Sequence, residues 1–186
     1  MYIPHATRLG KEITIIKPGE YHVSAEDDMI GTLLGSCVSV CLHDPVAMVS
    51  GMNHFMLPGR IVQADILQDR TARYGITAIN ELLAQMEAAG ASRERLTAKV
   101  FGGGHVIVTA FETSTLPSDN IRLARVMLEL EDIPIEEMDV GGPVGRKILM
   151  EAKTGRVYLR NLSRKAIEET LRGRKYRHMW EAIEAV

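Results

Sequence analysis

The stretch GSCVSVCLHDPVAMVSGMNHFMLP, residues 35–58, constrains the fold more than any other part of this 186-residue chain. Its first half is rich in valine, which is typical of a β-strand. Asp44-Pro45 is a turn signal, because proline presets the φ angle that the second position of a type I turn needs. The second half returns as another apolar run and ends at Pro58. The pattern therefore predicts an antiparallel β-hairpin.

The predicted hairpin brings two reactive side chains together. A turn centred just after Pro45 places Cys37 opposite His54. It also places Cys41 opposite Ser50. Opposed Cβ atoms on one face of such a pair lie about 4.5–5.5 Å apart, so the thiol and the imidazole come within adjustable hydrogen-bond reach. A bulge or a longer loop would change this register.

Two interpretations of Cys37 and His54 stay open on these residues alone. In one, the imidazole takes the thiol proton and the thiolate acts as a nucleophile. Backbone N–H groups at Gly35-Ser36 could then hold an oxyanion during acyl transfer. In the other, both side chains pack in a core, because cysteine is among the most buried residue types. Cys41, deeper in the valine-rich run, suits packing better than attack.

A metal site is a weaker interpretation of the same stretch. Cys37, Cys41, His43 and His54 supply soft ligands, but their spacing matches no familiar zinc pattern. Two cysteines so close in sequence also make a poor disulfide framework. We therefore expect free thiols and no metal.

Composition narrows the class of protein. Apolar residues make up 46% and charged residues 25%, as in ordinary soluble globular proteins. The formal net charge of −2 gives no global field that would draw the chain to nucleic acid or anionic lipid. No apolar run reaches the roughly 18 residues of a membrane span, and the N-terminus lacks the apolar region of a secretory signal. The expectation is a cytoplasmic protein that inserts in no membrane.

The remaining periodicity predicts an α+β domain with helices packed on a mostly antiparallel sheet. From residue 76 the apolar spacing becomes helical, up to Gly90. A second helix is predicted over residues 118–133, with Ser118 or Asp119 as its N-cap. Further predicted elements are strands on either side of Pro18-Gly19, a strand before the glycines at 102–104, a hairpin turning at 154–155 and a helical tail from 163 to 186.

Several motifs in this chain resemble the CheD family, the chemoreceptor glutamine deamidases of bacterial and archaeal chemotaxis. They are LLGSCVSVCLHDP, MNHFMLP, YGITAINELLAQMEAAGA, KVFGGG, DNIRLARVMLELEDIPI and DVGGPVGRKILMEAKTGRVYLRNL. Together they cover about residues 16–162 in the family's order, which is more specific than any one motif. The resemblance implies a CheD-like deamidase domain at 1–162, with a basic helical extension at 163–186.

The resemblance also assigns roles. It implies that Cys37 is the nucleophile, that His54 is its base and that Thr32 takes the part of a family threonine shortly before the cysteine. The family places that threonine one residue further away, where this chain has Gly31. The implied fold is a three-layer α/β/β sandwich. The glycine loop departs from the family. After FGG the family usually has a small residue followed by Asn-Met-Phe, whereas this chain has Gly104 followed by His105, Val106 and Ile107.

The function implied is hydrolysis of glutamine side chains to glutamate on the cytoplasmic domain of chemoreceptors, through a thioester and without a cofactor. A second implied partner is a CheC-type phosphatase. The alternative is a non-catalytic regulator that binds the receptor and the phosphatase. A cysteine peptidase would use the same nucleophile and base, but it would cut the receptor backbone.

Overall fold

A computed structural model of the chain describes residues 10–57, 67, 72–106, 115–163 and 165. Two α-helices and a short 3₁₀ helix lie in these ranges: α1 (Ala72–Ala88), η2 (Arg93–Arg95) and α2 (Leu116–Leu130). The strands are β1 (Ile13–Ile15), β2 (Tyr21–Ser24), β3 (Met29–Leu34), β4 (Val38–Asp44), β5 (Val49–Asn53), β6 (Thr97–Gly102), β7 (Ile135–Val140), β8 (Gly145–Glu151) and β9 (Val157–Leu162).

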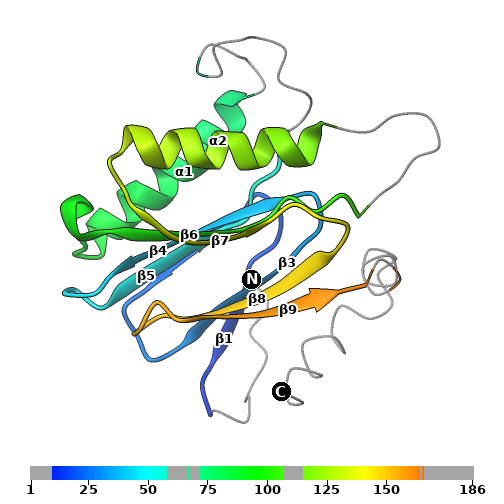
Figure 1. The fold of residues 1–186 in the computed structure, drawn as a ribbon. Helices are drawn as coiled ribbons and strands as arrows, with labels where there is room; N and C mark the ends of the chain where they lie inside the picture. Colours follow the sequence, from blue (N-terminus) through cyan, green and yellow to red (C-terminus); the bar gives the residue numbers. More distant parts are fainter. Residues whose placement is uncertain (1–9, 58–66, 68–71, 107–114, 164, 166–186) are drawn as a thin grey trace.

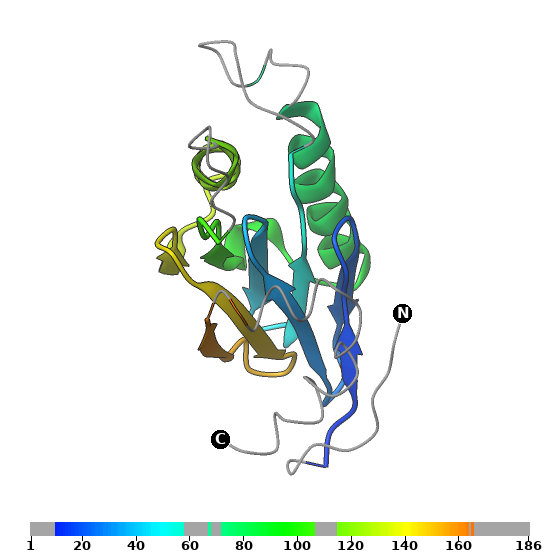
Figure 2. The ribbon, with the colours of Figure 1, turned by 90° about the vertical axis from the view of Figure 1, so that its right-hand side faces the viewer.

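The strands form two sheets stacked face to face. One sheet has the order β2-β5-β4-β6-β7 and the other β1-β3-β8-β9. Helices α1 and α2 lie side by side over the outer face of the five-stranded sheet, and the four-stranded sheet lies beneath it (Figure 1, Figure 2). Among the described strand pairs, β1–β3 and β6–β7 are parallel and the others antiparallel. The predicted three-layer α/β/β sandwich with mostly antiparallel sheets is confirmed.

Two apolar clusters hold the layers together. The larger lies between the helices and the five-stranded sheet, where Ile79, Leu82, Leu83 and Met86 of α1 meet the valines of β4. The smaller fills the space between the sheets and contains Ile16, Ile30, Leu34, Cys41, Met52, Phe101, Ile148 and Met150. Alternation along β4 explains both, since Val38, Val40 and Leu42 point to the helices and the residues between them to the other sheet. Cys41 is fully buried, and packing is its role, as predicted.

The β4–β5 hairpin forms as predicted, but its predicted register is wrong. Asp44 pairs with Val49 and Cys41 with Met52, and an isolated bridge joins Val38 to Phe55. Cys37 is therefore not directly opposite His54. The connection has four residues, 45–48, where the Asp-Pro signal indicated two.

Asp44 is the physical reason for the longer loop. Its carboxylate accepts hydrogen bonds from the backbone N–H groups of Val46 at 2.9 Å and Ala47 at 3.1 Å, which curls the chain beyond the proline. It also accepts two hydrogen bonds from Arg95, the shorter at 2.7 Å. The register shifts by two residues as a result. Because side chains alternate with a period of two, an even shift leaves every side chain on its predicted face.

The start of α2 differs from its predicted position, and one strand, β7, was not predicted. α2 begins at Leu116 with Pro117 in its first turn, so Thr115 takes the N-cap position expected at Ser118 or Asp119. Proline fits there because the first helical N–H groups have no partner within the helix. β7 was not predicted from the sequence, because this edge strand is largely exposed and its three acidic residues obscure the apolar alternation of a strand. The predicted strands flanking Pro18-Gly19 are present as β1 and β2, and they belong to different sheets.

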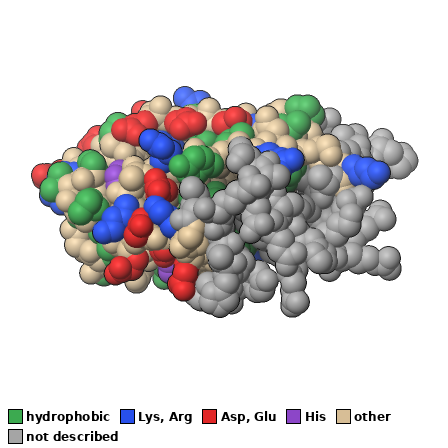
Figure 3. Space-filling view, turned by 90° about the horizontal axis from the view of Figure 1, so that it is seen from below, with side chains coloured by type: hydrophobic (Ala, Val, Ile, Leu, Met, Phe, Trp, Pro, Cys, Tyr) green, Lys and Arg blue, Asp and Glu red, His purple; other side chains and the backbone are tan. Residues whose placement is uncertain are grey.

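The predicted helical tail lies almost wholly outside the described residues, which stop at 163 and 165. In the described part of the chain, no helix has the length and hydropathy to span a bilayer. Acidic and basic side chains are interspersed on the described surface seen from below, without a patch of one sign (Figure 3).

Candidate active site

A hydrogen bond between the two sheets fixes the tautomer of His54. Thr32, on β3, donates its hydroxyl proton to the Ile16 carbonyl oxygen at 2.8 Å. The same hydroxyl oxygen lies 2.7 Å from His54 Nδ1. Since the threonine proton is already used, its oxygen accepts, and Nδ1 must carry the imidazole proton. Nε2 is left as the basic nitrogen.

His54 Nε2 is buried and, among the described residues, has no hydrogen-bond partner. The whole side chain is only 2% exposed. A buried polar atom without a partner costs about 1–3 kcal/mol, so such atoms in native proteins usually have a functional reason. Here the orientation of the ring leaves a basic nitrogen that can accept a proton from a neighbouring group.

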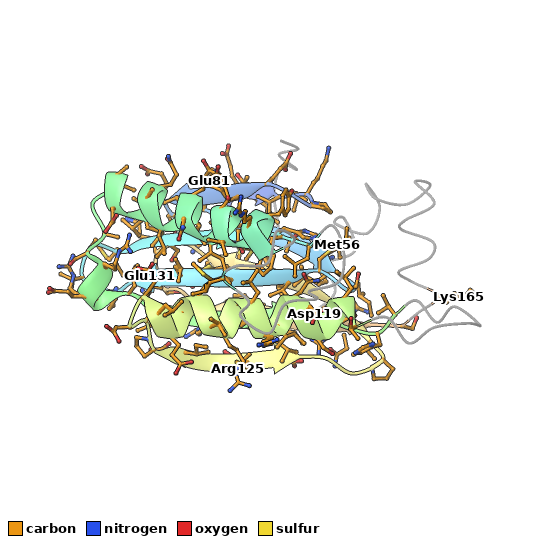
Figure 4. All side chains as sticks on the ribbon, turned by 90° about the horizontal axis from the view of Figure 1, so that it is seen from above. Met56, Glu81, Asp119, Arg125, Glu131 and Lys165 are labelled. Atoms are coloured by element: carbon orange, nitrogen blue, oxygen red, sulfur yellow. The ribbon has the colours of Figure 1, made fainter. Side chains whose placement is uncertain are left out.

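Cys37 lies on the same face as this nitrogen. Extending the Val38–Phe55 bridge by one residue places Met56 opposite Cys37, and His54 is then the diagonal neighbour of Cys37, two positions along. Diagonal neighbours have Cβ atoms about 7–8 Å apart, a gap that an imidazole can span. Cys37 is half-buried at the edge of the inter-sheet cluster. Met56 is 38% exposed and lies at the end of the molecule where α2 begins, near Asp119 (Figure 4).

Burial sets the charge state of both groups. It raises the pKa of the Cys37 thiol to about 11, although the adjacent Cys37 N–H partly offsets this. Burial likewise lowers the pKa of His54 to about 3. The resting pair at neutral pH is therefore a thiol and a neutral imidazole, rather than a thiolate–imidazolium pair. Such a pair suits a general base that removes the proton as attack begins.

A glycine-rich segment forms the wall beside Cys37. Gly103 N–H donates to the Cys37 carbonyl oxygen at 2.7 Å, and Gly104 N–H donates to the Gly35 carbonyl oxygen at 2.8 Å. A Cβ atom on Gly102 would collide with the Cys37 carbonyl oxygen. Glycine at this position thus lets two backbones approach closely next to Cys37.

Asn120, on α2, belongs to the site although the sequence interpretation did not single it out. Its Oδ1 accepts from Leu57 N–H at 2.9 Å, and its Nδ2 donates to the Ser36 carbonyl oxygen at 2.9 Å. The side chain is fully buried. A signal was present, because Asn120 interrupts the apolar face formed by Leu123, Ala124 and Met127.

The metal interpretation finds no support in the described residues, where no three His, Cys, Asp or Glu side chains converge. His43 points its Nδ1 at Ser50 Oγ, 2.9 Å away, near the turn end of the hairpin. His105 is half-buried, and its backbone N–H donates to the Gly142 carbonyl oxygen at 2.8 Å. Neither imidazole has a described contact with Cys37 or His54.

Comparison with known proteins decides the family. A family model described as CheD chemotactic sensory transduction matches residues 56–161. The chain belongs to the CheD family. A probable chemoreceptor glutamine deamidase CheD 1 of Anaeromyxobacter dehalogenans is 41% identical over 153 residues, covering 82% of this chain and 86% of that protein.

Other CheD relatives are similar over still more of this chain. A probable chemoreceptor glutamine deamidase CheD of Laribacter hongkongensis is 38% identical, covering 87% of this chain and 77% of its own. A CheD 2 of Shewanella oneidensis with the same description is 38% identical over 95% of this chain and 90% of its own. Among solved structures, a Neisseria meningitidis protein aligns with a TM-score of 0.48 and 12% identity, covering 84% of this chain and 77% of that one.

Proposed function

We propose that this CheD protein hydrolyses glutamine side chains of chemoreceptors to glutamate, with Cys37 as the nucleophile and His54 as the base. Relatives described as probable chemoreceptor glutamine deamidases support the substrate class. One structural observation carries the chemistry: the buried Nε2 of His54 has no partner in the described structure, while Thr32 holds the opposite nitrogen.

The first half of the reaction forms a thioester. His54 Nε2 removes the Cys37 proton as the sulfur attacks the carboxamide carbon, and the carbonyl oxygen becomes an oxyanion. The imidazolium returns its proton to the amide nitrogen when the carbon–nitrogen bond breaks and ammonia leaves. Thr32 accepts from Nδ1–H throughout, which keeps the ring oriented and stabilises its transient charge.

The second half restores the enzyme. His54 Nε2 takes a proton from water, and the resulting hydroxide attacks the thioester carbon. The carbon–sulfur bond breaks, glutamate leaves and the sulfur regains its proton from the imidazolium. Every proton transfer in this cycle uses one nitrogen atom of the chain.

The proposed substrate is the helical cytoplasmic part of the receptor, which places the reaction in the cytoplasm. Each conversion replaces a neutral amide by a carboxylate and so adds one negative charge to the receptor bundle. The resemblance also predicts a CheC-type phosphatase as a second partner. It predicts, in addition, that the chain divides into a domain at 1–162 and an extension at 163–186.

Peptide mapping of a receptor tests this proposal. The purified protein is incubated with a chemoreceptor cytoplasmic fragment, and the receptor peptides are then analysed by mass spectrometry. We expect conversion of specific glutamines to glutamates in an otherwise intact receptor. A receptor left unchanged by folded protein would favour the regulator alternative, and receptor fragments would indicate a peptidase. Either result would overturn the proposal.

A further inference from the structure

The orientation of one peptide group governs where an oxyanion can be held next to Cys37. The peptide that joins Ser36 to Cys37 carries the Ser36 carbonyl oxygen and the Cys37 N–H. In a trans peptide these two groups point in opposite directions, and the described chain contains no cis peptide bond. Whatever holds the Ser36 carbonyl therefore aims the Cys37 N–H.

Asn120 is the group that holds this carbonyl. Its amide orientation is fixed by its two partners, because the Leu57 N–H can only face Oδ1 and the Ser36 carbonyl can only face Nδ2. The residue is fully buried, so water does not compete for either bond. The Cys37 N–H consequently points away from α2.

In the described structure, three backbone amides next to Cys37 are already engaged, whereas the Cys37 N–H is not. Gly103 N–H is bound to the Cys37 carbonyl oxygen, and Gly104 N–H to the Gly35 carbonyl oxygen. Val38 N–H is bound to the Phe55 carbonyl oxygen at 3.0 Å. By contrast, no described carbonyl accepts the Cys37 N–H, which lies beside its own sulfur.

We propose that Asn120 is a positioning residue for acyl transfer, which aims the Cys37 N–H at the oxyanion by holding the Ser36 carbonyl from behind. The inference rests on the proposed function of Cys37 as an acyl-transfer nucleophile. Asn120 also ties the segment before Cys37 to the segment after His54, because Leu57 lies three residues beyond the base. One buried side-chain amide thereby fixes both the backbone that precedes Cys37 and the backbone that follows His54.

The test separates acyl transfer from simple nucleophilicity. In p-nitrophenyl acetate the Cys37 sulfur attacks an ester carbon, an oxyanion forms, and p-nitrophenolate leaves as the carbon–oxygen bond breaks. In iodoacetamide the same sulfur displaces iodide from a methylene carbon, and no oxyanion forms. The ratio of the two rate constants, after subtraction of the Cys37→Ala background, reports the oxyanion donor and needs no receptor.

Asn53 provides a matched control for Asn120. It is equally buried, its Oδ1 accepts from Val40 N–H at 2.9 Å, and its Nδ2 donates to the Ala78 carbonyl oxygen at 3.3 Å. It therefore joins a strand to a helix with the same chemistry, but it does not touch the peptide before Cys37. Asn53→Ala should lose comparable stability without changing the aim of that peptide.

We expect the acylation-to-alkylation ratio to fall at least about tenfold in Asn120→Ala, since loss of one oxyanion donor costs about 10²–10³ in rate. In Asn53→Ala the ratio should stay within about twofold of wild type. If Asn120→Ala does not fold, Asn120→Asp, which keeps an acceptor for Leu57, is measured instead at a pH where its carboxylate is charged. An unchanged ratio, or an equal fall in both alanine variants, would overturn the inference.

The two proposals fail in different ways. A tenfold fall in the ratio together with an unmodified receptor would leave the role of Asn120 standing and refute the receptor as substrate. Receptor conversion with an unchanged ratio would do the reverse.

Discussion

Thr32 connects the orientation of the His54 imidazole to the backbone of the neighbouring segment at Ile16. Its hydroxyl has both roles filled, as donor to Ile16 and as acceptor from His54. Without the hydroxyl, the Nδ1 proton has no described partner and the imidazole can change tautomer. Nε2 would then carry the proton and could not act as a base.

Thr32→Val removes this hydroxyl at nearly constant volume. We expect deamidation kcat to fall about 10- to 100-fold and stability to fall by about 1–3 kcal/mol, because a buried N–H and a buried carbonyl lose their partner. Thr32→Ser keeps the hydroxyl and should recover most of the rate. The check is kcat and urea unfolding for both variants, and equal rates in Thr32→Val and Thr32→Ser would contradict the role of the hydroxyl.

The depressed pKa of His54 makes stability depend on pH in a defined direction. Burial lowers its folded-state pKa to about 3, whereas the unfolded chain has the ordinary value near 6.5. Below pH 6.5 the unfolded state binds a proton that the folded state does not, so stability falls as pH falls from 6.5 towards 3. At pH 5 the loss relative to pH 8 amounts to about 2 kcal/mol from this residue.

His54→Gln removes this titrating group, so the variant is the reference against which the wild type is compared. The difference in unfolding free energy between wild type and His54→Gln, measured by urea denaturation at pH 8 and pH 5, isolates the histidine from the other carboxyl and imidazole groups. Wild type should lose about 2 kcal/mol more than the variant between these two pH values. Parallel pH curves for the two proteins would show that His54 is not buried as a neutral imidazole.

The hairpin that carries Cys37 and His54 shows what could be predicted from sequence at the level of elements. Valine-rich strands and an Asp-Pro turn give the hairpin and the faces of its side chains. The loop length depends on the hydrogen bonds that the Asp44 carboxylate accepts. Two of the donors, Arg95 and the Ser92 N–H, are distant from Asp44 in sequence. Register was therefore predicted two residues off, yet on the correct faces. Asn120 escaped notice because its partners, too, belong to segments far away in the chain.

The glycine segment beside Cys37 makes a second prediction at this scale. Gly102 has φ +109°, and a Cβ there would meet the Cys37 carbonyl oxygen. Gly90, at the end of α1, has φ +98° and open space around it. Both positions disfavour alanine by backbone conformation, but only Gly102 touches the site.

We expect Gly90→Ala to cost about 1 kcal/mol and to leave kcat within about twofold of wild type. Gly102→Ala should cost more stability and lower kcat at least about tenfold, because the nucleophile's own peptide must move. Unfolding free energies and initial deamidation rates provide the measurement. Equal kcat values in the two variants would mean that this wall is not part of the active site.

At the scale of the whole molecule, the site is assembled from all three layers. Thr32 comes from the four-stranded sheet, Cys37 and His54 lie next to the ends of β4 and β5 in the five-stranded sheet, and Asn120 comes from α2 (Figure 1). No single element carries the chemistry, so its geometry exists only when the layers are stacked. Sequence periodicity predicted an α+β domain with helices packed on a mostly antiparallel sheet, and the resemblance to CheD implied the three layers. The resemblance to CheD, rather than the periodicity, indicated which residues meet between them.

The chain contains a matched pair for the central claim, because its two cysteines differ in position and not in chemistry. Cys37 is half-buried at the edge of the inter-sheet cluster, and Cys41 is fully buried within it. The decisive measurement is the rate of glutamine conversion on a receptor cytoplasmic fragment by wild type, Cys37→Ala and Cys41→Ala. We expect no conversion by Cys37→Ala at nearly unchanged stability, and conversion close to wild type by Cys41→Ala despite some loss of stability. Conversion by Cys37→Ala at the wild-type rate would contradict the account.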